Sequence, residues 1–424
     1  MRVKKSTAQK KAIRVAPELP GGFRDYPPEM TVAKQRILDT ARRTFELFGF
    51  EPMETPAVER TEVLTGGEAD SQKIIFNVVG SQDKGESDTS LRFDLTVPLA
   101  RFIAANPAIP KPFKRYQMGN VWRGERPQKG RYREFTQADI DIVGSSSPAA
   151  DAEVIAAIYT TLKNLEVGEF VIKINDRAVL NDLPRLAGFP EEKLWDALRI
   201  IDKRGKIGTA DVVQELTAEF NATAAEKIEK FLAEPLALPD IEKKLTAIKI
   251  PREYYRFDKT LVRGLSYYTG TIFEATLTDL PEIGSVFGGG RYDNLVMNFT
   301  GQKIPAVGAS LGVDRLLAAL EQQRKFDASK TLQVLVLNLS ENLENECLAI
   351  TQQLRDLGVN ATLYLGDDRD FRAQLAYAVK KEIPYVVIYG EDENKRGVVA
   401  IKNLKARTQE NVARRNIKEY FMRP

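Results

Sequence analysis

Histidine is missing from this sequence of 424 residues. Its absence excludes Ser-His-Asp and Cys-His nucleophile systems, histidine-ligated metals and acid–base catalysis by histidine. An enzyme made from this chain must work with carboxylates, arginines, backbone dipoles and bound Mg²⁺.

Cysteine and long apolar runs are also scarce. The single cysteine, Cys347, rules out a disulfide framework, so we expect a protein of a reducing compartment, the cytoplasm. No run approaches the roughly 18 apolar residues of a membrane span, so no membrane association is expected. The formal net charge of +3 permits a nucleic-acid partner without predicting one, because clustering of basic residues matters more than their total.

The chain is too long for one ordinary core, and its patterns divide it into segments. Residues 1–19 are basic and are expected to form a disordered tail, with an organelle transit peptide as the weaker alternative. Residues 20–325 mix strands with helices, including a helix at 28–48 and a helical insertion at about 178–250, which predicts an α+β domain. In residues 331–424 short apolar strands alternate with helices, which predicts a smaller α/β domain.

The segment RGERPQKGRYREF, residues 123–135, is predicted to connect the two strands of a hairpin. Its charge alone would suit a solvated loop. The strand pair, however, places Arg123 and Glu125 opposite the end of the second strand. A guanidinium on a sheet suits a phosphate because its planar fork donates two hydrogen bonds. Phe135 on the neighbouring strand is placed to stack on a purine.

Another arginine lies in LVRGLSYYTGTIFEA, residues 261–275, which has the alternation of a strand. Arg263 would be costly there without an anion, and an internal carboxylate and a ligand are about equally good candidates. Gly264 and Gly270 indicate that something approaches the backbone closely. In GASLGVDRLLAAL, Arg315 lies in the first turn of a helix. The three arginines would clamp a nucleotide triphosphate if the fold brings them together.

Together these segments resemble the class II aminoacyl-tRNA synthetases, and among them the histidyl-tRNA synthetase family, over essentially residues 20–424. The helix at 28–48 with Pro56 is similar to motif 1, which forms a dimer interface. VWRGERPQKGRYREFTQADIDIVG resembles motif 2, and GASLGVDRLLAAL resembles motif 3. LVRGLSYYTG is similar to the histidine-specific signature, usually LVRGLDYYTG. The resemblance implies an antiparallel sheet core, a homodimer and a C-terminal domain that reads the anticodon loop.

The resemblance also implies an ATP site, with Mg²⁺ as the accompanying ion. Arg123 would bind the α-phosphate and the substrate carboxylate region, with Arg263 approaching from the opposite side. Phe135 and Arg315 would enclose the adenine, which Glu125 would face, and Arg315 would also hold the γ-phosphate. The three arginines are the expected catalytic residues, and no metal-ligating side chain is expected.

A site for L-histidine is implied beside the ATP site. Asp141 and Tyr268 would hydrogen-bond the two imidazole nitrogens, with Tyr267 nearby. The residues implied for the ammonium group are Asp94, Thr96 and Gln137. The residues implied for the acceptor end of tRNA(His) are Arg126, Gln128, Lys129 and Arg131.

Three positions depart from the family pattern. Gly124 and Thr136 stand where many members have histidine, and Ser266 replaces the usual aspartate of the signature. One rival reading is a non-catalytic paralogue, such as the histidine-sensing regulatory subunit of ATP phosphoribosyltransferase, but that protein lacks the C-terminal domain. Another is a class II synthetase for proline, threonine or glycine, against which the RGLSYYTG segment argues.

The lack of histidine leads to a prediction about synthesis of the protein. An enzyme that charges tRNA with histidine, but contains none, can be translated after charged tRNA(His) has run out. Ribosome profiling under histidine starvation should therefore show continued synthesis of this chain. A fall equal to that of ordinary proteins would leave compositional drift or engineering as the explanation.

Overall fold

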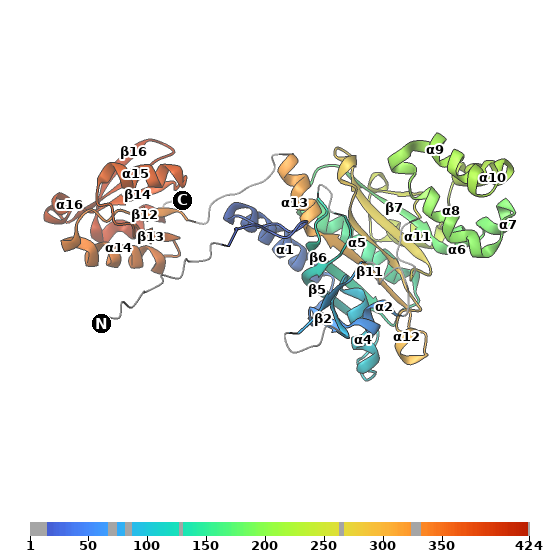
Figure 1. The fold of residues 1–424 in the computed structure, drawn as a ribbon. Helices are drawn as coiled ribbons and strands as arrows, with labels where there is room; N and C mark the ends of the chain where they lie inside the picture. The colour runs from blue at the N-terminus through green and yellow to red at the C-terminus, as the bar shows by residue number, and fades with distance from the viewer. Residues whose placement is uncertain are drawn as a thin grey trace, which may run out of the picture. The chain divides into compact units, whose positions relative to one another are not determined.

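The computed structural model describes residues 15–66, 74–80, 87–126, 130–262, 267–323 and 332–422. Most of the predicted basic tail, residues 1–14, lies outside them. The chain divides into two compact units, one of Met1–Asp25 with Lys34–Phe326 and the other of Tyr26–Ala33 with Asp327–Pro424. Each unit is described by itself below (Figure 1).

Helix α1 (Pro28–Leu47) matches the helix predicted at the start of the body. It begins at a proline, whose missing N–H costs nothing in the first turn. Ile37, Ala41 and Phe45, each four residues apart, are buried on one face. The helix gives way to Gly49, which has a φ of 73°, a conformation that suits glycine.

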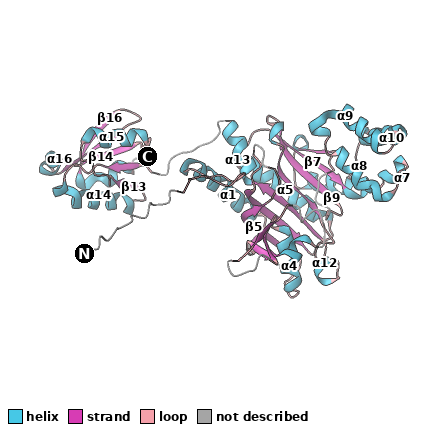
Figure 2. Ribbon diagram, viewed as in Figure 1, coloured by secondary structure: helices cyan, strands magenta, loops and turns pink. Residues whose placement is uncertain are grey.

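One large sheet organises the first unit (Figure 2). Among the described residues eight strands pair in the order β1-β5-β6-β11-β10-β9-β7-β8. The pairs β1–β5 and β7–β8 are parallel, and the others are antiparallel. The strands are β1 (Glu51–Pro52), β5 (Phe113–Trp122), β6 (Glu134–Val143), β7 (Phe170–Asp176), β8 (Tyr255–Phe257), β9 (Thr271–Leu277), β10 (Ser285–Arg291) and β11 (Ala306–Gly312). This antiparallel-rich sheet confirms the predicted fold class, and β5 and β6 are the predicted hairpin.

Helix α5 (Pro148–Asn164) covers one face of this sheet. Lys114 on β5 pairs with Glu153 of the helix at 2.6 Å, and Arg291 on β10 pairs with Asp151. Side chains alternate between faces along a strand, so Arg115, the neighbour of Lys114, lies on the opposite face. That opposite face carries the candidate site.

Smaller elements complete this unit. A second sheet contains β2 (Val58–Arg60), β4 (Thr89–Leu91) and β3 (Phe76–Val78). Besides α1 and α5, the described helices outside the insertion are α2 (Thr61–Thr65), α4 (Thr96–Ala105), α12 (Met297–Thr300) and α13 (Val313–Gln322). The predicted insertion is helical and contains α6 (Arg177–Asn181), α7 (Leu183–Ala187), α8 (Leu194–Ile201), α9 (Arg204–Glu219), α10 (Ala222–Ala233) and α11 (Pro239–Ala247).

The predicted strand over residues 261–275 is wrong at the described residues 261–262 and 267–270. Strand β9 begins only at Thr271, while Leu261 and Val262 are buried without strand pairing. The backbone before β9 bonds irregularly, because the Asn175 side chain donates to the Leu261 carbonyl at 2.9 Å and the Arg177 N–H donates to that of Gly270 at 2.9 Å. These carbonyls therefore serve the loop rather than a strand ladder.

The second unit contains a mixed sheet, as the alternation of strands and helices predicted. Its order is β13-β12-β14-β15-β16, with β12 parallel to β13 and β14 and the remaining pairs antiparallel. The strands are β12 (Val334–Val336), β13 (Ala361–Leu363), β14 (Tyr385–Ile388), β15 (Val398–Asn403) and β16 (Thr408–Ala413). The helices are α14 (Glu344–Asp356), α15 (Phe371–Lys380), α16 (Glu391–Arg396) and α17 (Ile417–Phe421). In the described part of the chain no helix is long and apolar enough to cross a membrane.

Candidate active site

Strand β6 places a row of functional side chains on the face of the sheet opposite α5. Phe135, Gln137, Asp139 and Asp141 occupy every second position of the strand and therefore point the same way. Of these, Phe135, Gln137 and Asp141 are predicted site residues, and the structure places them on one face. Across from the row, the register pairs β6 with glycines on β11: Gly308 with Asp141 and Gly312 with Gln137.

Gly308 leaves the space above it free for the Asp141 side chain. A β-carbon at this position would lie 1.9 Å from Oδ1 of Asp141 and 2.7 Å from the Ile140 carbonyl oxygen. Gly290 on β10 is similarly restricted, since a β-carbon there would lie 2.9 Å from the Tyr268 ring. These glycines allow side chains of the site to lie directly on the sheet.

Replacement of Gly308 by alanine tests this packing. The added methyl group would displace the Asp141 carboxylate, and we expect the KM for histidine to rise by about tenfold to 10²-fold, since a 1 Å misplacement can have that effect. Histidine-dependent ATP–pyrophosphate exchange measures it. Gly205→Ala is the control, because a β-carbon there meets nothing within 4 Å. An unchanged KM in Gly308→Ala would contradict the role of Asp141.

Asp141 is buried and has two partners. The Tyr292 hydroxyl donates to Oδ1, and Arg115 forms an ion pair with Oδ2 at 2.7 Å. Burial raises the pKa of Asp141 above its usual range, although the Arg115 charge and the Tyr292 hydrogen bond oppose the rise. The Tyr292 hydrogen bond orients the carboxylate through Oδ1, whereas Oδ2 faces the Arg115 charge without a hydrogen bond among the described residues and so keeps lone pairs for a ligand.

Asp94 lies in the segment before α4. Its Oδ1 accepts a 3.0 Å hydrogen bond from the Val97 N–H at the start of that helix, and its Oδ2 is buried without a hydrogen-bond partner among the described residues. Burial raises the pKa of Asp94 to about 6, while this hydrogen bond and the charge of Arg123 act in the opposite direction. An unpartnered, buried carboxylate oxygen is suited to a cationic ligand.

The predicted tyrosines connect the two aspartates. Tyr267 lies close to Thr96 and Asp94, and burial raises the pKa of its hydroxyl well above the usual value, with Tyr268 and the Asp94 carboxylate acting in the same direction. Its ring centroid lies 4.9 Å from that of Tyr268 and 5.9 Å from that of Tyr292, which donates to Asp141. The predicted residues for the ammonium group and for the imidazole thus belong to one connected cluster.

Arg123 begins the loop after β5. Its Nε donates to the Phe93 carbonyl at 3.0 Å, and its guanidinium lies 5.2 Å from the centroid of the Phe135 ring. Within the described segments, the two Nη groups of Arg123 make no hydrogen bond. This places a planar cation between Phe135 and Asp94, next to both predicted subsites.

Arg315 lies on α13, directly after β11. Its Nη1 donates to the Ser285 carbonyl at 2.5 Å. The preceding residue, Asp314, is buried, accepts from the Thr136 N–H at 2.6 Å and pairs with Arg24 at 3.1 Å. These contacts tie the start of α13 to β6 beside Phe135.

Several predicted site residues either lie outside the described residues or are exposed on the hairpin loop. Arg263, Gln128 and Lys129, together with Ser266, lie outside the described residues. The remaining loop residues, Glu125, Arg126 and Arg131, are exposed. The Glu125 carbonyl accepts a 3.3 Å hydrogen bond from Arg133, which orders the base of the loop.

Three residues of the cluster were not predicted: Arg115, Asp139 and Tyr292. Asp139 is buried, and burial raises its pKa to about 7. A signal existed, because two aspartates separated by one residue in an apolar strand share a face and require a cation. The arginine that supplies it lies directly opposite Asp141 in the β5–β6 register.

The described residues do not form a metal site of their own. In this part of the chain no group of three or more acidic, histidine or cysteine side chains converges on a common position.

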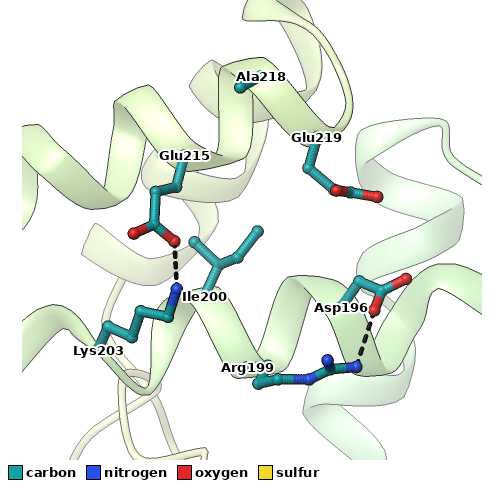
Figure 3. Close-up of a pocket in the computed structure, with 7 residues that line it drawn as sticks. All are labelled: Asp196, Arg199, Ile200, Lys203, Glu215, Ala218 and Glu219. Atoms are coloured by element: carbon teal, nitrogen blue, oxygen red, sulfur yellow. Dashed lines mark hydrogen bonds and ion pairs between the residues drawn. The ribbon is translucent and has the colours of Figure 1, made fainter.

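A pocket of about 340 Å³ lies elsewhere, in the helical insertion (Figure 3). It is formed by α8, α9 and their connection. Its charged groups pair with one another, with Lys203–Glu215 at 2.6 Å and Arg199–Asp196 at 2.8 Å. It contains none of the predicted site residues, so it does not compete with the sheet as the candidate active site.

Comparison with known proteins agrees with this geometry. The histidyl-tRNA synthetase family model matches residues 22–316, and an anticodon-binding domain model matches residues 333–423. A histidine–tRNA ligase of Wolinella succinogenes is 41% identical over 426 residues, covering 93% of this chain and 95% of the relative. The crystal structure of histidyl-tRNA synthetase from a Nostoc species has a TM-score of 0.82 and 33% identity, covering 96% of this chain and 99% of that one.

The antiparallel sheet and its arginine- and aspartate-bearing face are those of a class II aminoacyl-tRNA synthetase. The chain belongs to the histidyl-tRNA synthetase family, whose members are ATP-dependent aminoacyl-tRNA ligases. The predicted family and enzyme class are confirmed. A Bacillus halodurans structure described as an ATP phosphoribosyltransferase regulatory subunit/histidyl-tRNA synthetase is 24% identical, with a TM-score of 0.70, and shows the fold alone. Nothing in these comparisons favours the regulatory alternative.

Proposed function

We propose that the face of the sheet opposite α5 binds histidine and Mg·ATP side by side and joins them as histidyl-adenylate. Asp94, Thr96 and Gln137 bind the ammonium group of histidine. Asp141 and Tyr268 hydrogen-bond its imidazole, with Tyr267 nearby.

The phosphates are bound by arginines. Arg123 holds the α-phosphate from one side, and Arg263 approaches it from the other. Arg315 holds the γ-phosphate and, with Phe135, encloses the adenine, which Glu125 faces. Planar guanidinium groups suit this role because each donates two hydrogen bonds to phosphate oxygens.

The reaction needs little proton transfer. The histidine carboxylate attacks the α-phosphorus of ATP; an oxygen–phosphorus bond forms, and the bond to pyrophosphate breaks. Negative charge accumulates on the phosphoryl oxygens, so positioning and fixed positive charge supply the rate enhancement. An active site that has no histidine side chain of its own can perform such a step.

The second step transfers histidine to the 3′-terminal ribose hydroxyl of tRNA(His), which displaces AMP. Two described residues, Arg126 and Arg131, lie in the hairpin loop with Gln128 and Lys129, and we assign all four to the acceptor end. Residues 331–424 read the anticodon loop, and residues 20–325 form the catalytic domain. We also propose a homodimer through motif 1, and a cytoplasmic location consistent with the free, buried Cys347.

The observation that best supports this proposal is the proximity of two buried aspartates across a group of tyrosines: Tyr267 lies close to Asp94 and 5.9 Å from Tyr292, whose hydroxyl donates to Asp141. One carboxylate is suited to an ammonium group and the other to a ring nitrogen. An apolar amino acid would still offer its ammonium group to Asp94, but it would bring no hydrogen-bond donor to Asp141 at the imidazole end, which selects against it.

ATP–pyrophosphate exchange with each amino acid tests the proposal. We expect exchange with histidine and none with proline, threonine or glycine. Binding of histidine without any exchange would support a sensing paralogue, and exchange with another amino acid would support a different class II specificity.

A further inference from the structure

Arg115 is the largest fully buried side chain of the described residues, with a relative exposure of 0%. Its Nη2 forms the 2.7 Å ion pair with Asp141 and also donates to the Leu95 carbonyl at 3.0 Å. Its Nε and Nη1 have no hydrogen-bond partner among the described residues. A buried guanidinium with unmet donors stabilises a fold less than an apolar side chain of similar size would. Packing alone therefore does not account for an arginine here.

The two contacts of Arg115 reach both ends of the histidine site. Leu95 lies between Asp94 and Thr96, which are assigned to the ammonium group, whereas Asp141 is assigned to the imidazole. We propose that Arg115 is a positioning residue that fixes the spacing and orientation of these two ends, so that the site fits histidine. This inference rests on the proposed function and deepens it.

The surrounding charges give Arg115 an electrostatic role as well. The acidic groups near it are Asp94, Asp139 and Asp141, and its positive charge lowers the pKa of each against the effect of burial. Other polar groups near these carboxylates include the buried Arg92, whose charge interacts with Asp139, and also Arg123, Gln117, Tyr267, Tyr292 and Ser310. Asp94, with a pKa of about 6, and Asp139, with a pKa of about 7, titrate near neutral pH, and burial also raises the pKa of Asp141.

Removal of the charge tests the proposal through kinetics and pH dependence together. In Arg115→Met we expect the KM for histidine in pyrophosphate exchange to rise at least about tenfold, with the KM for ATP changed less than about twofold. The acid limb of kcat/KM for histidine should move to higher pH, because Asp141 and Asp94 then bind protons more readily. The substrate imidazole also titrates near pH 6.5, but equally in every variant, so differences between variants report the protein.

Two further variants separate position from charge. Arg115→Lys keeps the charge but has a single ammonium in place of the fork, so the KM for histidine should rise while the acid limb stays in place. Asp139→Asn removes a neighbouring negative charge, so its acid limb should move to lower pH, opposite to Arg115→Met. These variants also keep the proposal testable if Arg115→Met fails to fold.

Arg291→Met is the matched control, because Arg291 is a buried, ion-paired arginine of the same sheet whose partner is Asp151 on α5. We expect it to lower the melting temperature without changing the KM for histidine or the acid limb. Arg115 variants that behave like this control would overturn the proposal. Wild-type protein without histidine-dependent exchange would instead show that the proposed function itself is wrong.

Discussion

Replacement of Arg123 by lysine is expected to lower kcat for histidine activation by about 10²- to 10³-fold. The charge is kept, but a lysine cannot both hold the Phe93 carbonyl, as Nε of Arg123 does at 3.0 Å, and present a two-pronged donor to a phosphate. The lost interaction strengthens only as charge develops on the α-phosphoryl group. The effect should therefore appear mainly in kcat, measured by pyrophosphate exchange at saturating histidine and ATP.

Arg204→Lys serves as the control for this substitution. Arg204 lies in the helical insertion and makes two hydrogen bonds to Glu229, at 2.7 and 2.9 Å, so it has the same fork on an internal carboxylate. We expect its kcat to equal that of the wild type. If Arg123→Lys also retains wild-type kcat, Arg123 does not bind the transferring phosphoryl group.

The same substitution at Arg263 extends the argument to the opposite side of the phosphate. If both arginines clamp one phosphoryl group, Arg263→Lys should lose a similar share of kcat. The double variant should then lose less than the product of the two single losses, because residues acting as a unit are not additive. Independent, multiplicative losses would show that the two side chains do not act on the same group.

Asp94→Asn is expected to raise the KM for histidine by about tenfold to 10²-fold, the value of a hydrogen bond to a charged partner. The substitution keeps the shape of the side chain and the 3.0 Å acceptor for Val97 N–H, but removes the charge that faces the ammonium group. The KM for ATP should change little. Asp211→Asn, at an exposed position of α9, is the control.

Asp94 also gives the ligand-free protein a specific dependence of stability on pH. Its pKa is about 6 in the folded state, compared with an ordinary value of 3.8, so the folded protein holds this proton longer than the unfolded chain does. The contribution of Asp94 to the free energy of unfolding is therefore largest below pH 3.8. This contribution, about 3 kcal/mol, is lost as the pH rises through about 6. Asp139, with a pKa of about 7, acts in the same direction up to that pH.

Thermal unfolding at pH 5 and pH 7.5 measures this effect. Between these values the wild-type melting temperature should fall more than that of Asp94→Asn. Added histidine should stabilise the wild type more at pH 7.5, because its ammonium group then meets an ionised carboxylate. If Asp94→Asn keeps the wild-type pH dependence of the melting temperature and the wild-type response to histidine, another group is responsible for both.

The sequence allowed much of this site to be predicted because several of its residues share one strand. Phe135, Gln137 and Asp141 follow the two-residue period of β6, so their common face could be inferred once the hairpin was recognised. Arg123 was predicted to lie at the hairpin, and Arg315 in the first turn of a helix.

The remaining features depend on partners distant in sequence. The place of Arg115 in the site follows only from the strand register that sets it opposite Asp141. The place of Tyr292 follows only from its hydroxyl group, which donates to the same carboxylate. The extent of β9 was mispredicted for a similar reason. Leu261 has the apolar character of a strand residue, but its carbonyl is bonded by the Asn175 side chain.

By itself the sequence determined the kinds of elements, their order along the chain and the chemistry available: apolar periodicity fixes helices and strands locally, and the absence of histidine limits catalysis to carboxylates, arginines and backbone groups. Only the tertiary structure decided which charges neutralise one another. Burial and strand register depend on residues far apart in the chain, and together they decide whether Asp94, Asp139 and Asp141 can remain within one cluster around the buried Arg115.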